Sequence, residues 1–160
     1  MAAIHTMRHS LSAPLVGPNP ALLVHSGEII EETDRRLFSR GSNLTNVLAD
    51  GNNGFVLATY QDYYAGYGAF TTGDGRGADF YIEGTGVEFR GIKYPNGSPF
   101  DVFVDGIQQP TGGTCYAPSY AAYQRHYRLT GLPFGVHRIT TARTGGPDGR
   151  AYELDRIIVL

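Results

Sequence analysis

Short stretches in which apolar and polar side chains alternate constrain the fold of this chain more than any other feature. In residues 100–106, Phe100, Val102 and Val104 fall on one side and the residues between them fall on the other. Residues 123–129 and 135–143 alternate in a similar way. Successive side chains of a β-strand point to opposite faces, so a period of two predicts strands. About eight such segments follow residue 50, at the spacing of a sandwich or barrel.

Turn-forming residues separate these segments. The 160 residues include 22 Gly, 9 Pro, 11 Tyr and 8 Phe, which is typical of many short strands joined by tight turns. Asn96–Gly97 is a pair that favours positive φ, and Asp105 is best explained as a turn residue before Gly106. We therefore predict an all-β protein in which residues 36–160 form an antiparallel two-sheet jelly-roll sandwich. The best candidate for a helix is the short segment 42–51.

Residues 1–35 are predicted to be an extended N-terminal arm. Pro14, Pro18 and Pro20 oppose a helix because proline fixes φ and lacks a backbone donor. The arm is either a disordered tail or a segment that becomes ordered on a partner subunit. Within it, residues 21–32 have the composition of a strand, or of a pair of strands broken at Gly27.

Composition excludes several kinds of partner and compartment. The formal net charge is −2, so the surface as a whole attracts neither nucleic acid nor an anionic membrane. Cys115 is the only cysteine and forms no internal disulfide. No segment has the roughly 18 consecutive apolar residues of a membrane helix. The N-terminus lacks the apolar core of a signal peptide, so we expect synthesis in the cytoplasm.

Motifs for catalysis are absent from the sequence. It contains no GxSxG elbow, HExxH, P-loop or CxxC motif, and we therefore predict a protein without enzymatic activity or a cofactor. Carboxylates that could bind a hard cation occur in two places, Asp74 with Asp79 and Glu153 with Asp155. The alternative is that the first pair forms turns and that Asp155 is a solvated edge residue.

Tyrosines give the best indication of a binding surface. They gather in two segments, residues 60–67 and residues 116–127. Tyrosine offers broad amphipathic contact at low entropic cost, which suits both sugars and protein interfaces. The alternative is that these side chains fill the core, which is favoured for Tyr123 and Tyr127. The predicted binding residues are Tyr63, Tyr64, Tyr67, Arg76, Tyr116 and Tyr120.

The order of segments in residues 77–160 resembles the galactose-binding-like β-sandwich, a group that includes many carbohydrate-binding modules. The resemblance is carried by a strand that ends in Asp-Gly and by a Gly-Leu-Pro-x-Gly corner before the next strand. The matching residues are Gly84, Gly86, Phe89, Val102, Val104, Asp105, Gly106, Leu132, Gly135, His137, Ile139, Asp155 and Ile157. Related modules often hold a structural calcium ion near the last strand, which implies Asp155 as a candidate ligand.

Similar modules also occur in tail and surface proteins of bacteriophages. From this resemblance and the expected arm we predict a non-catalytic virion structural protein, either a head decoration (cement) protein or a tail-surface subunit. It would be made in the host cytoplasm, lie on the virion surface and contact other virion or capsid proteins, as a homo-oligomer such as a trimer. The alternative is a carbohydrate-binding module that recognises glycans or a host surface.

Overall fold

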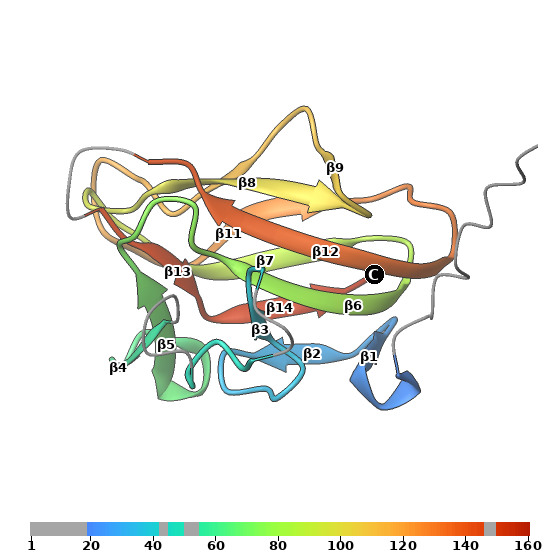
Figure 1. Cartoon of the computed structure of the whole chain (residues 1–160). Helices are drawn as coiled ribbons and strands as arrows, with labels where there is room; N and C mark the ends of the chain where they lie inside the picture. The colour runs from blue at the N-terminus through green and yellow to red at the C-terminus, as the bar shows by residue number, and fades with distance from the viewer. Residues whose placement is uncertain (1–18, 42–44, 50–54, 146–149) are drawn as a thin grey trace, which may run out of the picture.

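The computed structural model describes residues 19–41, 45–49, 55–145 and 150–160, and within them the chain is almost entirely β-structure (Figure 1). Two 3₁₀ turns, η1 (Pro20–Leu22) and η2 (Tyr64–Gly66), accompany the strands. No helix in these ranges is long and apolar enough to cross a membrane. The strands are β1 (Leu23–His25), β2 (Ile29–Glu31), β3 (Phe38–Ser39), β4 (Val56–Thr59), β5 (Tyr67–Thr71), β6 (Ala78–Gly84), β7 (Val87–Lys93), β8 (Pro99–Val104), β9 (Ile107–Gln108), β10 (Gly113–Thr114), β11 (Ala121–Leu129), β12 (Gly135–Arg143), β13 (Tyr152–Leu154) and β14 (Arg156–Val159).

Two larger sheets form the sandwich, and a third, smaller sheet is added to it. The larger sheets have the strand orders β1-β6-β12-β8-β10, with β3 on β6 and β9 on β8, and β11-β7-β14-β2. A third sheet, β13-β5-β4, is present in addition to the two predicted sheets. Figure 1 shows β4 and β5 at the end of the molecule opposite β1. The pairing is antiparallel except between β1 and β6, which run parallel.

Aromatic rings from both larger sheets meet in the core. The ring of Phe89 on β7 lies 6.0 Å from that of Phe80 on β6 and 5.8 Å from that of Phe100 on β8. Tyr152 stacks on Phe100 at 4.5 Å and so ties the third sheet to the same core. Burial of these rings supplies the apolar area that a domain of this size needs for stability.

The strand β8 confirms the predicted alternation. Phe100, Val102 and Val104 are buried, whereas the residues between them are partly exposed. Asp105 and Gly106 both have positive φ, +52° and +84°, and they turn the chain between β8 and β9 as predicted.

In β11 the predicted alternation is wrong. Arg125 pairs with Arg90 and Tyr127 pairs with Phe89, so His126 is an extra residue in the strand. Such a β-bulge interrupts the strict period of two. As a result His126 and Tyr127 are both buried, although they are adjacent in the sequence.

The predicted boundary between arm and sandwich is also wrong. Strands β1 and β2 belong to the two larger sheets, where they pair with β6 and β14, and Val24 and Ile30 are fully buried. The break predicted at Gly27 is confirmed, because this residue has a φ of +87° between the two strands. The first 18 residues of the predicted arm lie outside the described residues.

The predicted helix at 42–51 falls partly outside the described residues. Its described part, residues 45–49, consists of turns and one bridge between Asn46 and Phe38. The Asn46 side chain accounts for the turn, since it donates to two backbone carbonyls and accepts from the backbone N–H of Leu48. Asparagine competes with a helix in this way because its amide satisfies backbone groups locally.

Candidate functional site

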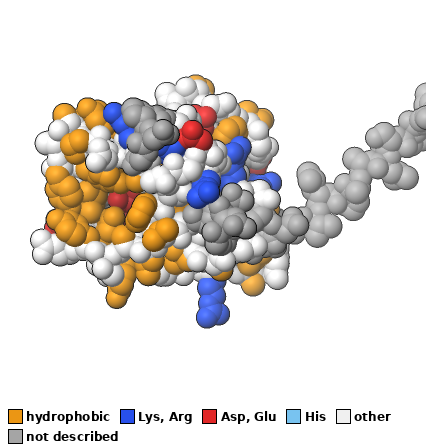
Figure 2. Space-filling model, turned by 60° about the vertical axis from the view of Figure 1, so that its left-hand side comes forward, with side chains coloured by type: hydrophobic (Ala, Val, Ile, Leu, Met, Phe, Trp, Pro, Cys, Tyr) orange, Lys and Arg blue, Asp and Glu red, His pale blue; other side chains and the backbone are white. Residues whose placement is uncertain are grey.

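A tyrosine-lined pocket lies where the third sheet meets the ends of the sandwich. It has a volume of about 340 Å³. Figure 2 shows that hydrophobic side chains cover much of the face that comes forward from the β4–β5 end. The pocket combines an apolar lining with a few polar groups, which is the usual composition of a site for a small ligand. Its lining residues are Ala58, Tyr60, Tyr63, Phe70, Ile92, Tyr94, Tyr120, Ala151 and Glu153.

Three tyrosine rings on one side of the pocket contact one another edge to face. The ring of Tyr60 lies 6.4 Å from that of Tyr63 and 6.0 Å from that of Tyr120. Tyr60 and Tyr120 remain 49% and 47% exposed. The Tyr120 hydroxyl donates to Asp62 Oδ2 at 2.9 Å and is thereby oriented. Two large aromatic rings are therefore held in place while about half of their surface stays open to a ligand.

Tyr63 is fixed more firmly than its two neighbours. Its ring lies directly on the backbone of Gly68 in β5, where a Cβ atom would be only 2.5 Å from a ring carbon. Its hydroxyl donates to Glu153 Oε2 at 3.0 Å. A side chain at residue 68 would displace the Tyr63 ring, so Gly68 is part of the structure of the pocket.

Glu153 is a buried acid in the pocket lining. It is 2% exposed, and its second oxygen, Oε1, accepts the backbone N–H of Ile92 at 3.1 Å. Gly91 on β7 makes room for it, since a Cβ there would lie 2.9 Å from this oxygen. Burial raises the pKa of Glu153 to about 7, against the lowering effect of its two hydrogen bonds. Both carboxylate oxygens of Glu153 thus accept hydrogen bonds from within the protein.

The structure brings together only two of the six predicted binding residues, Tyr63 and Tyr120. Tyr64 is half-buried beside the pocket, with the Arg156 guanidinium 4.0 Å above its ring. Tyr67 and Tyr116 are exposed and do not line the pocket. Arg76 lines a separate polar hollow.

Sequence analysis did not select Tyr60, Tyr94 or Glu153 for the binding site. Tyr60 lies in the same tyrosine-rich segment as Tyr63 and could have been included on that ground. Glu153 was weighed only as a calcium ligand. Tyr94 and Glu153 reach the pocket because β7, β13 and the η2 turn converge, and no spacing in the sequence encodes that convergence.

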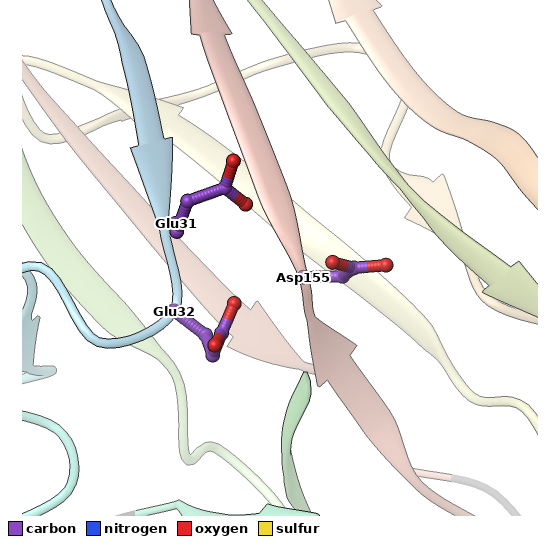
Figure 3. A group of neighbouring side chains, drawn as sticks. All are labelled: Glu31, Glu32 and Asp155. Atoms are coloured by element: carbon purple, nitrogen blue, oxygen red, sulfur yellow. The ribbon is translucent and has the colours of Figure 1, made fainter. Parts of the chain in front are cut away.

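A second cluster consists of three carboxylates. Glu31 and Glu32 come from the end of β2, and Asp155 lies between β13 and β14; one oxygen from each falls within 4.8 Å of the others. Figure 3 shows the Glu31 and Glu32 side chains reaching from the β2 segment toward the chain segment that carries Asp155. Glu32 and Asp155 are each 2% exposed.

The cluster has the chemistry of a site for a hard cation. Glu31 Oε2, Glu32 Oε2 and Asp155 Oδ1 are buried and have no hydrogen-bond partner in the described part of the chain. Burial and the neighbouring carboxylates raise the pKa of Glu32 to about 7 and that of Asp155 to about 8. Calcium is bound by several oxygen atoms at about 2.3–2.6 Å, which oxygens no more than 4.8 Å apart can provide. The residues therefore fit a calcium ion.

The other proposed cation ligands are used differently. Asp74 pairs with Arg143, and Asp79 pairs with Arg138. Glu153 belongs to the pocket. The buried polar contacts around Cys115 are also structural. The Cys115 Sγ lies 3.6 Å from His126 Nδ1. Burial raises the pKa of the thiol and lowers the pKa of His126 to about 4.

Similar folds are found among domains of proteins that act on carbohydrates. No protein-family model matches the sequence, and no curated protein matches it. One similar solved structure is a CBM36-1 domain of a multidomain xylanase from the hindgut metagenome of Trinervitermes trinervoides. It has a TM-score of 0.52 at 14% identity, with 81% of this chain and 93% of that chain covered.

Two larger enzymes contain a similar domain. A cycloisomaltooligosaccharide glucanotransferase from Paenibacillus has a TM-score of 0.54 at 16% identity, with 83% of this chain covered. A xanthan lyase from Paenibacillus has a TM-score of 0.53 at 13% identity, with 68% covered. The match spans only 18% and 12% of those two chains.

The fold is the all-β sandwich that the sequence predicted, and it is similar to the fold of the CBM36-1 domain. The three structures named above give no support to the predicted virion context. All three are parts of proteins that act on carbohydrates.

Proposed function

We propose that this chain is a carbohydrate-binding module that binds saccharides, without turning them over, at the tyrosine-lined pocket. The observation that carries the proposal is the half-exposed pair Tyr60 and Tyr120 beside the buried carboxylate of Glu153. Aromatic faces contact the apolar C–H surfaces of sugar rings, and the tyrosine hydroxyls supply hydrogen bonds at the rim.

The pocket supports binding more than hydrolysis. Glycosidases generally need two carboxyl groups on either side of the scissile bond. Glu153 is the one carboxylate among the residues that line the pocket, and both of its oxygens already accept hydrogen bonds from the protein.

The test compares tyrosines of equal exposure inside and outside the pocket. Tyr60→Ala and Tyr120→Ala should each weaken binding about tenfold or more to the saccharides that the wild-type chain binds on a glycan array, because exposed aromatic anchors dominate such contacts. Tyr67→Ala, at 45% exposure, is the matched control and should leave affinity unchanged. Equal losses for Tyr67 and Tyr60, or no binding by the wild-type chain, would overturn the proposal.

We also propose that Glu31, Glu32 and Asp155 hold a structural calcium ion. Such an ion would offset the repulsion among the three carboxylates, of which Glu32 and Asp155 are buried, and would supply partners to their unpaired oxygens. Asp155 Oδ2 also accepts the backbone N–H of Tyr64 at 3.2 Å. The cluster therefore contacts the η2 turn, which directly follows the pocket residue Tyr63.

Self-association, which a virion subunit would require, is a separate proposal. One observation favours it: in the described residues β4 pairs on one side only, with β5, and exposes Val56 and Leu57. An uncharged edge strand of this kind is a template for pairing with another chain. Light scattering of the wild-type chain and of Val56→Lys would test it, and a wild-type monomer at high concentration would exclude it.

A further inference from the structure

Two polar hollows on the outer side of the larger sheet β1-β6-β12-β8-β10 adjoin at Arg40. The first has a volume of about 400 Å³ and includes Phe103, Arg138 and Thr140 in its lining. The second, also about 400 Å³, includes Asp74 and Arg76. Because Arg40 lines both hollows, we consider them together and call them the arginine groove. Figure 2 shows Lys and Arg side chains gathered beside the apolar area.

Arg40 is held in place and still has donors to offer. Its Nη1 donates to the carbonyl of Gly75 at 2.8 Å, and its guanidinium lies 5.6 Å from the centre of the Phe103 ring. A guanidinium has five N–H donors in a planar fork, and among the described residues the Gly75 carbonyl accepts from one of them. A preformed fork of this kind suits two-pronged binding of a carboxylate.

Arg138, at the other end of the first hollow, is fixed by a buried acid. Its Nη2 donates to Asp79 Oδ2 at 2.6 Å, while Thr140 donates to Asp79 Oδ1 at 2.6 Å. Asp79 is 4% exposed, and its charge is balanced by Arg138. The Arg138 side chain nevertheless remains 47% exposed and lines the first hollow.

The charge of the groove differs in sign from that of the whole chain. Asp74 is balanced by Arg143 in the way that Asp79 is balanced by Arg138. Arg40 and Arg76 have no carboxylate partner among the described residues. The groove therefore carries a surplus of positive charge on a protein whose formal net charge is −2.

We propose that the arginine groove binds an acidic saccharide, one whose sugar rings carry carboxylates, at a site separate from the tyrosine pocket. Arg40, Arg76 and Arg138 line the two adjoining hollows, so a chain with a carboxylate on successive rings can meet more than one guanidinium. A nucleic acid is disfavoured, since the chain as a whole is acidic and Asp74 lines the groove. The choice of a saccharide among anionic polymers rests on the proposed function.

The experiment measures binding of a galacturonate hexamer by titration calorimetry at low salt, with the carboxyl-reduced, neutral hexamer as the matched ligand. The wild-type chain should bind the acidic hexamer about tenfold more tightly, because only it can pair with the guanidinium groups. Arg40→Gln should remove most of that preference. Arg125→Gln is the control, an exposed arginine of β11 without an ion pair in the described residues, and should leave the preference intact.

Each alternative result is decisive. Equal affinity for the acidic and neutral hexamers, or an unchanged preference in Arg40→Gln, overturns the proposal that the groove binds an acidic saccharide. So does tighter binding of a single-stranded DNA hexamer than of the galacturonate hexamer. If Tyr60→Ala abolishes binding of both saccharides and Arg40→Gln has no effect, the proposed function stands while the groove fails. If Tyr60→Ala has no effect and Arg40→Gln abolishes acidic binding, the reverse holds.

Discussion

Glu153 and Asp155 are two residues apart in the sequence, and both are buried acids, yet their surroundings differ. Both oxygens of Glu153 accept hydrogen bonds, one from a hydroxyl and one from a backbone N–H. Asp155 has one unpaired oxygen and lies beside Glu31 and Glu32, which each have another. A buried charge is costly unless it is paired. Hydrogen bonds within the protein therefore satisfy Glu153. The unpaired oxygens of the cluster around Asp155 need a proton or a cation as a partner.

Among the predicted effects on the free energy of unfolding, that of adding calcium should be the largest. At a hundredfold excess over its dissociation constant, calcium should raise the free energy of unfolding by about 2.7 kcal/mol, because it binds only the folded state. Asp155→Asn should abolish this gain, and Glu153→Gln should retain it. Denaturant unfolding with calcium and with a chelator provides the measurement. A gain that survives in Asp155→Asn would show that calcium binds elsewhere.

Removing Glu153 should be the next largest effect. Glu153→Leu leaves the buried N–H of Ile92 without a partner, which should lower the free energy of unfolding by about 2 kcal/mol. Glu153→Gln keeps one acceptor and should cost less. In the absence of calcium, Asp155→Asn should instead stabilise the protein above pH 8, since it removes one of three mutually repelling charges. A loss of stability in that variant would contradict the contrast between the two acids.

The pH dependence of stability should be spread over a wide range. The folded-state pKa values of Glu32 and Asp155, about 7 and about 8, lie above their ordinary values of 4.5 and 3.8. The folded state therefore holds more protons than the unfolded state between these limits, so stability falls as the pH rises from about 5 to 8. Both groups contribute a slope of this sign. Calcium should flatten it, and unfolding curves at several pH values would reveal a slope of the opposite sign.

Asp62 offers the smallest effect, because it is a hydrogen-bonded acid nearer the surface. Tyr120→Phe removes the hydroxyl that donates to Asp62 but keeps the ring. The free energy of unfolding should change by less than about 0.5 kcal/mol, as is usual for surface substitutions. Saccharide affinity should fall far less than in Tyr120→Ala, since the ring surface remains. An equal loss in both variants would assign the binding energy to the hydroxyl.

The sequence by itself determined the class of fold and some of its local detail. The alternation of Phe100, Val102 and Val104 predicts a strand with one buried face, and β8 is such a strand. Asp105 and Gly106 predict the turn that follows, because few residue types tolerate positive φ. These features depend on neighbours in the chain, so they can be read from it. Asp155 was also selected from the sequence, through the resemblance to related modules.

Only the tertiary structure decided which residues share a site. Glu31 and Glu32 join Asp155 because β2 pairs with β14, which places Ile30 opposite Ile157 from the other end of the chain. Tyr60 likewise meets Tyr120 from a distant segment of the chain. The same long-range pairing places β1 and β2 in the sandwich, against the predicted arm, because burial of Val24 and Ile30 depends on strands far away in the sequence. Local patterns record which face of a strand is buried, but the partner that buries it is chosen by packing between distant segments.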